Sequence, residues 1–524
     1  MPRERVSARR LAAALALGLA HAVSLSFAGL WWLQLVSFGG LALLAFSTAT
    51  STSDRGSGSS ARAAAIGFAF GLGWFVAGVG WLFISMHRYG GMPAPLALIA
   101  LLLFGAYLAL FPAAACALAD FVCRRRRFGD EGLTPIAAAS AIGGAFALSE
   151  LLRGWLFTGF PWLSTGYAHG DGPFAGLAPI VGVFGVGAAA CVSASLIALA
   201  LRSAWRDRQR PIAPWLLAIA IAATGPLADS IDWAQPAAST LRVDLIQGNV
   251  AQDLKFDPAR SLAAMNAYSR AIEPGRAQLI VMPETAWTVP WSQTPNEIAT
   301  RIQSALSDGA LAAIGMPLAA ADRSGRITNS IAVIDGNGAS IARYDKTHLV
   351  PFGEFIPTGF RWFVAMMNIP LGDFGRGASD QPMLRLRDQA IAFNICYEDL
   401  FGDELARQVR AGANVLINAS NIAWFGDSHA PEQHLQIARM RARELARPML
   451  RATNTGVTAA IDHQGRLLGR LPGYQLGTLS VDIAPTSGLT PFARWANLPA
   501  ALIAITLLGA AAIRSRTRRM QPDR

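Results

Sequence analysis

The first 240 residues contain a succession of long apolar stretches, and one more lies near the C-terminus. A helix needs about 20 mostly apolar residues to cross the hydrocarbon core of a bilayer. So many apolar stretches in succession favour membrane spans over buried core helices. The pattern predicts eight spans: Leu11–Phe27, Leu30–Phe46, Ala63–Phe83, Pro95–Leu118, Ile136–Leu152, Ala178–Leu201, Ile212–Leu227 and Leu498–Ile513.

The first apolar stretch follows several arginines, which is also how a cleaved signal peptide begins. The next apolar stretch starts at once, and no clear cleavage site of small residues separates the two. We therefore expect Leu11–Phe27 to be retained as a span.

Arginines gather between the predicted spans in a pattern that indicates topology. Cytoplasmic segments next to spans carry an excess of Lys and Arg. Eight alternating spans place every arginine cluster on the side of the N-terminus, with Arg88 and Arg153 on the other side. The prediction is that both termini are cytoplasmic and that residues 241–491 are exported. The clusters are the N-terminal tail, Arg55 with Arg62, Arg124–Arg127, Arg202–Arg210 and the tail after Arg514.

Residues 241–491 differ from the rest because acidic and basic residues are nearly balanced there. Short β-rich runs alternate with helical patterns, which is typical of a layered α/β domain. Ile334-Asp-Gly-Asn-Gly-Ala339 and Ile461-Asp-His-Gln-Gly465 carry hairpin-turn signals. We expect three parts: residues 1–240 with seven spans, the α/β domain, and residues 492–524 with the last span. The predicted strands are Val243–Gln247, Leu279–Met282, Leu311–Met316, Ile331–Ile334, Ile391–Ile395, Val415–Asn418 and Val457–Ile461, and the helices are Ser261–Ile272, Asn296–Leu306 and Gln433–Ala446.

Composition agrees with this division. The chain is 52% hydrophobic and 15% charged, against about 25% charged in soluble proteins, which excludes a purely soluble enzyme, a disordered chain and a disulfide scaffold. The net charge of +11 resides mainly in the membrane parts, so it indicates topology rather than nucleic-acid binding. No phosphate loop, dinucleotide fingerprint or zinc-ligand pair is present. His429 and His434 are five residues apart, which is poor metal geometry, and we interpret them as structural or surface residues. We expect no metal and no cofactor.

Three residues of the α/β domain suggest nucleophilic chemistry. Cys396 is the cysteine of this domain and ends the predicted strand Ile391–Ile395; a buried, inert thiol is the alternative to a reactive one. Glu284 follows the strand Leu279–Met282 in the same way. Lys346 is one of two lysines among the 45 basic residues, and a Lys ammonium is a compact, tunable donor where Arg is not.

The segments around these residues resemble the nitrilase superfamily, in which a Glu, a Lys and a Cys form the catalytic triad. Three further segments resemble its apolipoprotein N-acyltransferase branch: Asn418-Ala-Ser-Asn-Ile-Ala-Trp-Phe-Gly426, His434-Leu-Gln-Ile-Ala-Arg-Met-Arg-Ala-Arg-Glu444 and Arg451-Ala-Thr-Asn-Thr-Gly456. Gly78-Val-Gly-Trp81 and Arg153-Gly-Trp-Leu-Phe-Thr-Gly-Phe-Pro-Trp162 are similar to the membrane half of that branch.

The resemblance implies an integral membrane helical bundle of eight spans with an exported α/β nitrilase-like αββα sandwich domain before the last span. It implies a multi-pass protein of the bacterial inner membrane with its catalytic domain on the periplasmic side. The activity implied is transfer of an acyl chain from a phospholipid to the α-amino group of the diacylglyceryl-cysteine that begins an apolipoprotein. The partners would be these two lipids and the bilayer, and no nucleic acid.

Cys396 would be the nucleophile, Glu284 the general base, and Lys346 the cation that stabilises thiolate and oxyanion. Glu354 resembles the second glutamate that supports the lysine, with a surface carboxylate as the alternative. Tyr397 and Glu398 resemble site residues of the family.

Aromatic residues would cover the acyl chain. Phe256, Trp424 and Phe425 are candidates for substrate contact or a lid, with plain core aromatics as the alternative. The sequence departs from many relatives at Phe256, often Trp, and at Ile422, often Asp. A membrane-anchored amidase is the competing enzyme, and a transporter or scaffold with a degenerate domain is the competing class; the intact triad disfavours the second.

Overall fold

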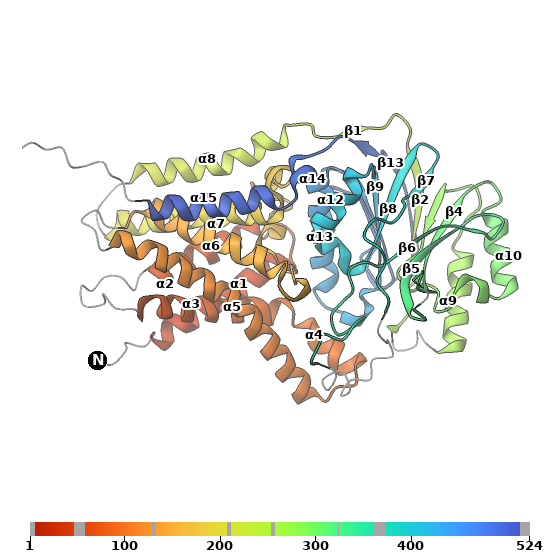
Figure 1. The fold of residues 1–524 in the computed structure, drawn as a ribbon, viewed down its shortest axis with the longest axis horizontal. Helices are drawn as coiled ribbons and strands as arrows, with labels where there is room; N and C mark the ends of the chain where they lie inside the picture. Colours follow the sequence, from red (N-terminus) through yellow and green to blue (C-terminus); the bar gives the residue numbers. More distant parts are fainter. Residues whose placement is uncertain are drawn as a thin grey trace, which may run out of the picture. The chain divides into compact units, whose positions relative to one another are not determined.

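The computed structural model describes residues 6–46, 58–127, 133–206, 211–252, 257–322, 324–360 and 374–513. The chain forms two compact units (Figure 1). The helical unit comprises residues 1–79, 102–231 and 497–524. The second unit comprises residues 80–101 and 232–496, and we call it the sheet unit.

The apolar stretches form helices, as predicted. Six are long and apolar enough to cross a membrane, whereas α2 and α15 are apolar but have only 16 and 15 residues. In the described residues the eight apolar stretches therefore form eight apolar helices, and six of these meet the length of a span. The helices are α1 (Ala8–Ser26), α2 (Trp31–Phe46), α3 (Gly58–Gly78), α5 (Ala94–Arg127), α6 (Pro135–Arg153), α7 (Ala178–Arg206), α8 (Ile212–Asp229) and α15 (Leu498–Ala512).

The third predicted span, Ala63–Phe83, is too long at its C-terminal end. Helix α3 ends at Gly78, and Trp81–Ile84 forms a separate short helix, α4, followed by a π-helical turn, η2 (Ser85–Tyr89). Glycine is unfavourable in a helix by about 1 kcal/mol relative to alanine, so Gly78 and Gly80 weaken continuation at this point. Because Trp81–Phe83 is apolar, the hydrophobic pattern alone did not indicate that α3 ends at Gly78.

A buried ion pair organises the end of α6. The side chains of Glu150 and Arg153 lie 3.3 Å apart and are almost fully buried. Arg153 also donates to the carbonyl of Trp162 at 2.8 Å, and Glu150 accepts from the backbone N–H of Thr165 at 2.8 Å. A buried charge needs a partner, and Glu150 and Arg153 are partners of each other. Their hydrogen bonds to Thr165 and Trp162 fix the irregular segment after α6.

The sheet unit contains two six-stranded sheets and a small two-stranded one. In each large sheet the central strands are parallel and the outer strands antiparallel. The first sheet has the order β13 (Gly477–Ile483), β2 (Leu241–Gln247), β3 (Leu279–Val281), β4 (Leu311–Ala319), β5 (Ile327–Ile334), β6 (Ser340–Asp345). The second has the order β12 (Leu467–Arg470), β11 (Ala459–Ile461), β10 (Met449–Thr453), β9 (Val415–Ser420), β8 (Gln389–Ile395), β7 (Leu384–Leu386), and β1 (Gln235–Pro236) pairs with β14 (Thr486–Ser487).

The two large sheets pack face to face between helices. One core joins apolar residues of both sheets, such as Val243 and Ile417. Helices α9 (Pro258–Arg270) and α10 (Asn296–Ala305) cover the other face of the first sheet. Helices α12 (Gly402–Arg410), α13 (Ala430–Leu445) and α14 (Pro491–Trp495) cover the other face of the second, as Figure 1 shows. This is the predicted αββα sandwich, and because both faces of each sheet are covered, β8 and β9 are buried at every position.

Both predicted hairpins are present. Strands β5 and β6 pair antiparallel around the turn at Asp335, whose carboxylate accepts from the backbone N–H groups of Asn337 and Ala339. Strands β11 and β12 pair in the same way around Asp462. The Asp and Gly residues of the two segments therefore predicted the positions of both hairpin turns.

Candidate active site

Glu284 lies just beyond the carboxyl end of the parallel strand β3, where α/β folds present ligand-binding groups. The next residue, Thr285, has a positive φ of 53°, so the chain turns sharply here. Gly315 on β4 allows this turn to approach, because a Cβ at that position would lie 2.3 Å from the carbonyl oxygen of Pro283. Glu284 is thereby held almost fully buried.

Lys346 follows β6 and contacts two carboxylates. Its Nζ lies 2.9 Å from Oε1 of Glu354 and 3.4 Å from Oε1 of Glu284. Glu354 also accepts from the backbone N–H of Val350 at 2.8 Å. The side chains of Lys346, Glu284 and Glu354 are only 1%, 9% and 8% exposed, so these charges interact with little screening by water.

Two asparagines that the sequence analysis did not select complete this cluster. Asn329 on β5 donates from Nδ2 to Oε1 of both Glu284 (2.6 Å) and Glu354 (2.8 Å). The backbone N–H of Asn421 donates to Oε2 of Glu284 at 2.8 Å. The signal for Asn329 was available, since it lies in the polar run Thr328–Ser330 of an otherwise apolar strand.

Cys396 directly follows β8 and begins the short helical turn η8 (Cys396–Leu400). Its φ is +53°, an uncommon value for a residue with a Cβ, and such backbone is found where a strand-to-helix turn presents a nucleophile. Asn418 on β9 supports the turn by donating to the carbonyl of Cys396 at 3.1 Å. The geometry is that of a presented thiol.

The charges around Cys396 oppose its ionisation. Burial and the carboxylate of Glu284 raise the pKa of the thiol well above its usual value, while Lys346 acts to lower it. Burial lowers the pKa of Lys346, but Glu354 and Glu284 outweigh it and the net pKa is raised. The directions of both shifts favour a protonated thiol beside a charged ammonium.

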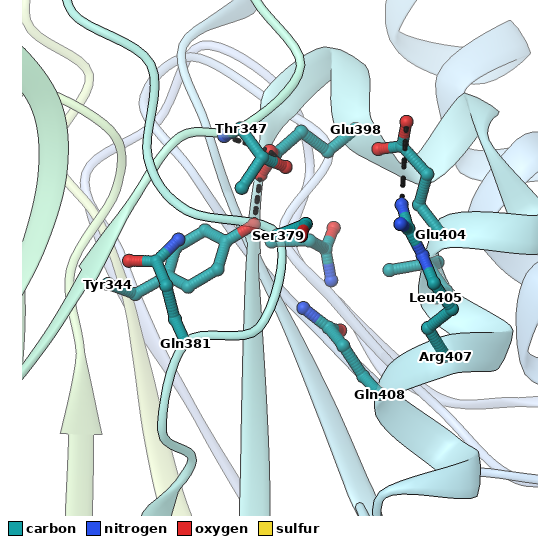
Figure 2. A pocket seen from close by; sticks show the side chains of 10 residues that line it. Tyr344, Thr347, Ser379, Gln381, Glu398, Glu404, Leu405, Arg407 and Gln408 are labelled. Carbon is teal, nitrogen blue, oxygen red and sulfur yellow. Dashed lines mark hydrogen bonds and ion pairs between the residues drawn. The ribbon is translucent and has the colours of Figure 1, made fainter.

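Glu398 joins the turn of Cys396 to the segment of Lys346. Its Oε1 accepts from the backbone N–H groups of Thr347 (2.6 Å) and His348 (3.0 Å), and its Oε2 accepts from the hydroxyl of Tyr344 (2.9 Å) and the backbone N–H of Ile395 (2.7 Å). Figure 2 shows Glu398 with Tyr344 and Thr347 at the edge of a small polar pocket that Gln408 also lines. Glu398 thus holds the lysine segment against the nucleophile turn.

The other predicted site residues lie in different surroundings. Tyr397 is buried against Phe401, with ring centroids 5.3 Å apart. Trp424 and Phe425 are half-buried in η9 (Ile422–Phe425) and contact the segment after α3. The centroid of Phe425 lies 4.1 Å from that of Trp81, and Trp424 lies 6.1 Å from Tyr89.

Phe256 lies outside the described residues, so its contacts are not described. Ile422 is fully buried. His429 is exposed, whereas His434 is fully buried beside Asp399. Among the residues that the structure describes, no group of three or more His, Cys, Asp or Glu side chains is arranged to hold a metal ion.

Comparison with known proteins agrees with this architecture. Residues 12–196 match the apolipoprotein N-acyltransferase N-terminal domain, and residues 242–491 match the carbon-nitrogen hydrolase family. The apolipoprotein N-acyltransferase of Ralstonia nicotianae is 46% identical over 97% of this chain and 94% of its own length. That of Bordetella bronchiseptica is 42% identical over 84% of this chain and 85% of its own. An amidase from Nesterenkonia sp. has 22% identity and a TM-score of 0.35, covering 47% of this chain and 92% of its own.

The sheet unit and the two family matches define the class of protein: a carbon-nitrogen hydrolase domain joined to an apolar helical domain of a membrane protein. Within that class the identity to full-length relatives is decisive. The chain belongs to the apolipoprotein N-acyltransferase family, and it is an acyltransferase enzyme.

Proposed function

We propose that the chain transfers a fatty acyl group from a phospholipid to the α-amino group of the diacylglyceryl-cysteine at the N-terminus of an apolipoprotein, through a thioester on Cys396. The observation that carries the proposal is the buried cluster of Glu284, Lys346 and Glu354 around a thiol presented at the end of β8. Phospholipid and lipoprotein both reside in membranes, which suits a catalytic domain joined to apolar helices.

The first step forms the thioester. Glu284 takes the proton of the Cys396 thiol as the sulfur attacks the ester carbonyl, because the raised pKa of the thiol disfavours a preformed thiolate. Lys346 stabilises the oxyanion of the tetrahedral intermediate, a contribution of about 3–4 kcal/mol for one such donor. The ester C–O bond then breaks, and the departing lysophospholipid oxygen takes the proton from Glu284.

The second step transfers the acyl group to nitrogen. The neutral amine of the diacylglyceryl-cysteine attacks the thioester, and Glu284 takes the proton that the nitrogen loses. The C–S bond breaks, the sulfur recovers the proton from Glu284, and the amide product leaves. The enzyme returns to its starting protonation state, so the two steps balance.

The charge of the cluster favours this proton path. Two carboxylates and one ammonium carry a net charge of −1, which repels a separate thiolate. Movement of the thiol proton to Glu284 keeps that net charge unchanged, so the nucleophile forms without adding charge to a buried site. The low exposure of the three side chains also favours amine over water at the thioester.

The placement that we propose is a multi-pass protein of the bacterial inner membrane with residues 241–491 on the periplasmic side and both termini cytoplasmic. The arginine clusters between the apolar stretches support this orientation. Cysteine labelling with a membrane-impermeant maleimide at an exposed position, such as Ser324→Cys, in intact spheroplasts tests it. Labelling before lysis supports export, and labelling only after lysis contradicts it.

The reaction is tested with the purified full-length chain in detergent, a phospholipid and a diacylglyceryl-cysteine peptide. Mass spectrometry of the enzyme before peptide addition should show an acyl group on Cys396, and peptide addition should discharge it as an N-acyl product. Cys396→Ala should show neither. Amide formation by Cys396→Ala at the normal rate would contradict the mechanism, and release of free fatty acid or ammonia without amide product would favour an amidase.

A further inference from the structure

Three fully buried side chains lie behind the nucleophile and take no part in the proposed reaction. Asp399 belongs to η8, the turn that begins with Cys396. His434 lies on α13, and Arg451 lies on β10. The side chains of all three are 0% exposed, so each must find its partners inside the protein.

The alternation of β10 brings Arg451 to this place. Leu450 and Ala452 point into the core between the two sheets, so Arg451 between them points to the opposite face of the strand. That face is covered by α13, which carries His434. Three elements distant in sequence thus meet behind Cys396.

The contacts of the three side chains form a closed triangle. Nε2 of His434 lies 2.7 Å from Oδ1 of Asp399, and Arg451 Nη1 donates to Oδ2 of Asp399 at 3.0 Å. Arg451 Nη2 lies 3.2 Å from Nδ1 of His434. Because guanidinium can only donate, the contact with Arg451 is a hydrogen bond only when Nδ1 accepts, which places the proton of a neutral imidazole on Nε2, toward Asp399.

The triangle also reaches the backbone and the charge of Cys396. A hydrogen bond between the His434 ring and the backbone of Cys396 contributes to the environment of the imidazole, whose pKa is lowered by burial and by Arg451. The negative charge of Asp399 acts to raise the pKa of the Cys396 thiol. The positive charge of Arg451 also interacts with Cys396 and favours its thiolate.

Other charges act on the same groups from the elements packed against them. Glu284, Lys346 and Glu354 face Cys396 from the first sheet, and Glu432 on α13 acts on Arg451. Glu398 lies in the same turn as Cys396 and acts on Lys346. Asp399 and Arg451 are thus two of the charges on the nucleophile's own side of the site.

We propose that Asp399, His434 and Arg451 act together as positioning residues that fix the turn carrying Cys396 and balance the charge behind its thiol. Two measurements test this role: acylation of Cys396 by a phospholipid, which rests on the proposed function, and alkylation of Cys396 by iodoacetamide, which does not. A wild-type chain that alkylates but never acylates would overturn the proposed function alone.

The experiment compares Asp399→Asn and Arg451→Gln with Arg447→Gln. Arg447 is a matched control because it is also buried but donates to the carbonyls of Ala413, Ala446 and Gly488. The rate of Cys396 alkylation by iodoacetamide is measured as a function of pH, and the rate of Cys396 acylation by phospholipid is measured in single turnovers. Loss of the Asp399 charge should move the alkylation profile to lower pH and loss of the Arg451 charge to higher pH, and both should slow acylation about tenfold or more at unchanged KM.

The control should lower only the melting temperature. The positioning role is overturned if Asp399→Asn and Arg451→Gln lose melting temperature as Arg447→Gln does but keep the wild-type alkylation profile and acylation rate. If either charge variant does not fold, His434→Gln and His434→Leu decide the matter. Glutamine can donate to Asp399 and accept from Arg451, so it should retain most acylation where leucine loses it; equal wild-type acylation by both variants would also overturn the role.

Discussion

Replacing Glu354 with glutamine tests whether the second glutamate acts through its charge. Lys346 Nζ lies 2.9 Å from Oε1 of Glu354, and both side chains are more than nine-tenths buried. At an effective dielectric constant of about 20, two unit charges at this distance attract by about 6 kcal/mol. Glutamine keeps the size and a carbonyl acceptor, so the attraction between two opposite charges is lost while a hydrogen bond from the ammonium to a neutral acceptor remains.

Two measurements on Glu354→Gln should move in opposite directions. After burial and Glu284, Glu354 is among the groups that raise the pKa of Cys396, so its removal should lower that pKa. Each unit of lowering increases the thiolate fraction about tenfold at a pH below the pKa, so alkylation at neutral pH should become faster. Acylation should slow about tenfold, because a hydrogen bond to a charged acceptor exceeds a neutral one by about 1–2 kcal/mol and Lys346 is held less firmly.

The assay uses the full-length chain in detergent. Iodoacetamide labelling of Cys396 is followed by mass spectrometry between pH 6 and about 10, a range that brackets an ordinary cysteine, and the first turnover is followed by lysophospholipid release. Glu297→Gln is the matched control, because Glu297 is 83% exposed on α10, and both rates should stay unchanged in it. If alkylation and acylation slow together in Glu354→Gln, Glu354 does not act on the thiol through its charge and the reasoning is wrong.

Three further changes test other parts of the site. Gly315→Ala should slow acylation at least tenfold by displacing Glu284, since the new Cβ would lie 2.3 Å from the carbonyl oxygen of Pro283; Gly509→Ala, which meets nothing within 4 Å, should not affect single-turnover rates. Glu398→Gln should lower the free energy of unfolding in denaturant by about 2–4 kcal/mol, because its buried carboxylate accepts several hydrogen bonds worth about 1.5–3 kcal/mol each; an unchanged value would exclude its joining role. Burial lowers the pKa of His434, so the unfolded chain takes up a proton near pH 6.5 that the folded chain does not, and stability should fall below that pH by up to about 1.4 kcal/mol per unit; pH-dependent melting of His434→Gln should show a shallower fall.

Periodicity predicted the α/β domain well where its strands and helices are regular, and the resemblance implied that they form a sandwich. Val415–Asn418 and Ile391–Ile395 are buried on both faces and therefore appear as plain apolar runs. Strand β10 was not predicted, because Arg451 interrupts its apolar pattern and only tertiary contact with Asp399 explains a buried arginine there. Strand β13 was not predicted either, because it lies at a sheet edge and is largely half-exposed or exposed.

The sequence was enough to select the proposed catalytic residues of the candidate site, but not the residues that hold them in place. Glu284, Lys346 and Cys396 stand at strand ends with family-like neighbours, so local sequence was enough to select them. Asn329 joins Glu284 to Glu354 only because β5 lies beside β4 in the first sheet, a relation that depends on strand order. Side-chain networks that close across elements have no local pattern, so the interpretation of His434 as a structural or surface residue could not name its partners.

The partners of the three glutamates separate their roles. Glu398 accepts from backbone N–H groups and hydroxyls of neighbouring segments, and such donors hold a carboxylate in place between those segments. Glu354 accepts from Lys346, Asn329 and the backbone of Val350, an arrangement that orients the ammonium. Glu284 shares the same lysine at the longer distance of 3.4 Å and acts more strongly on Cys396 than Glu354 does. The weaker hold on Lys346 and the stronger action on the thiol are what a proton acceptor requires, so the geometry supports Glu284 over its neighbours as the base.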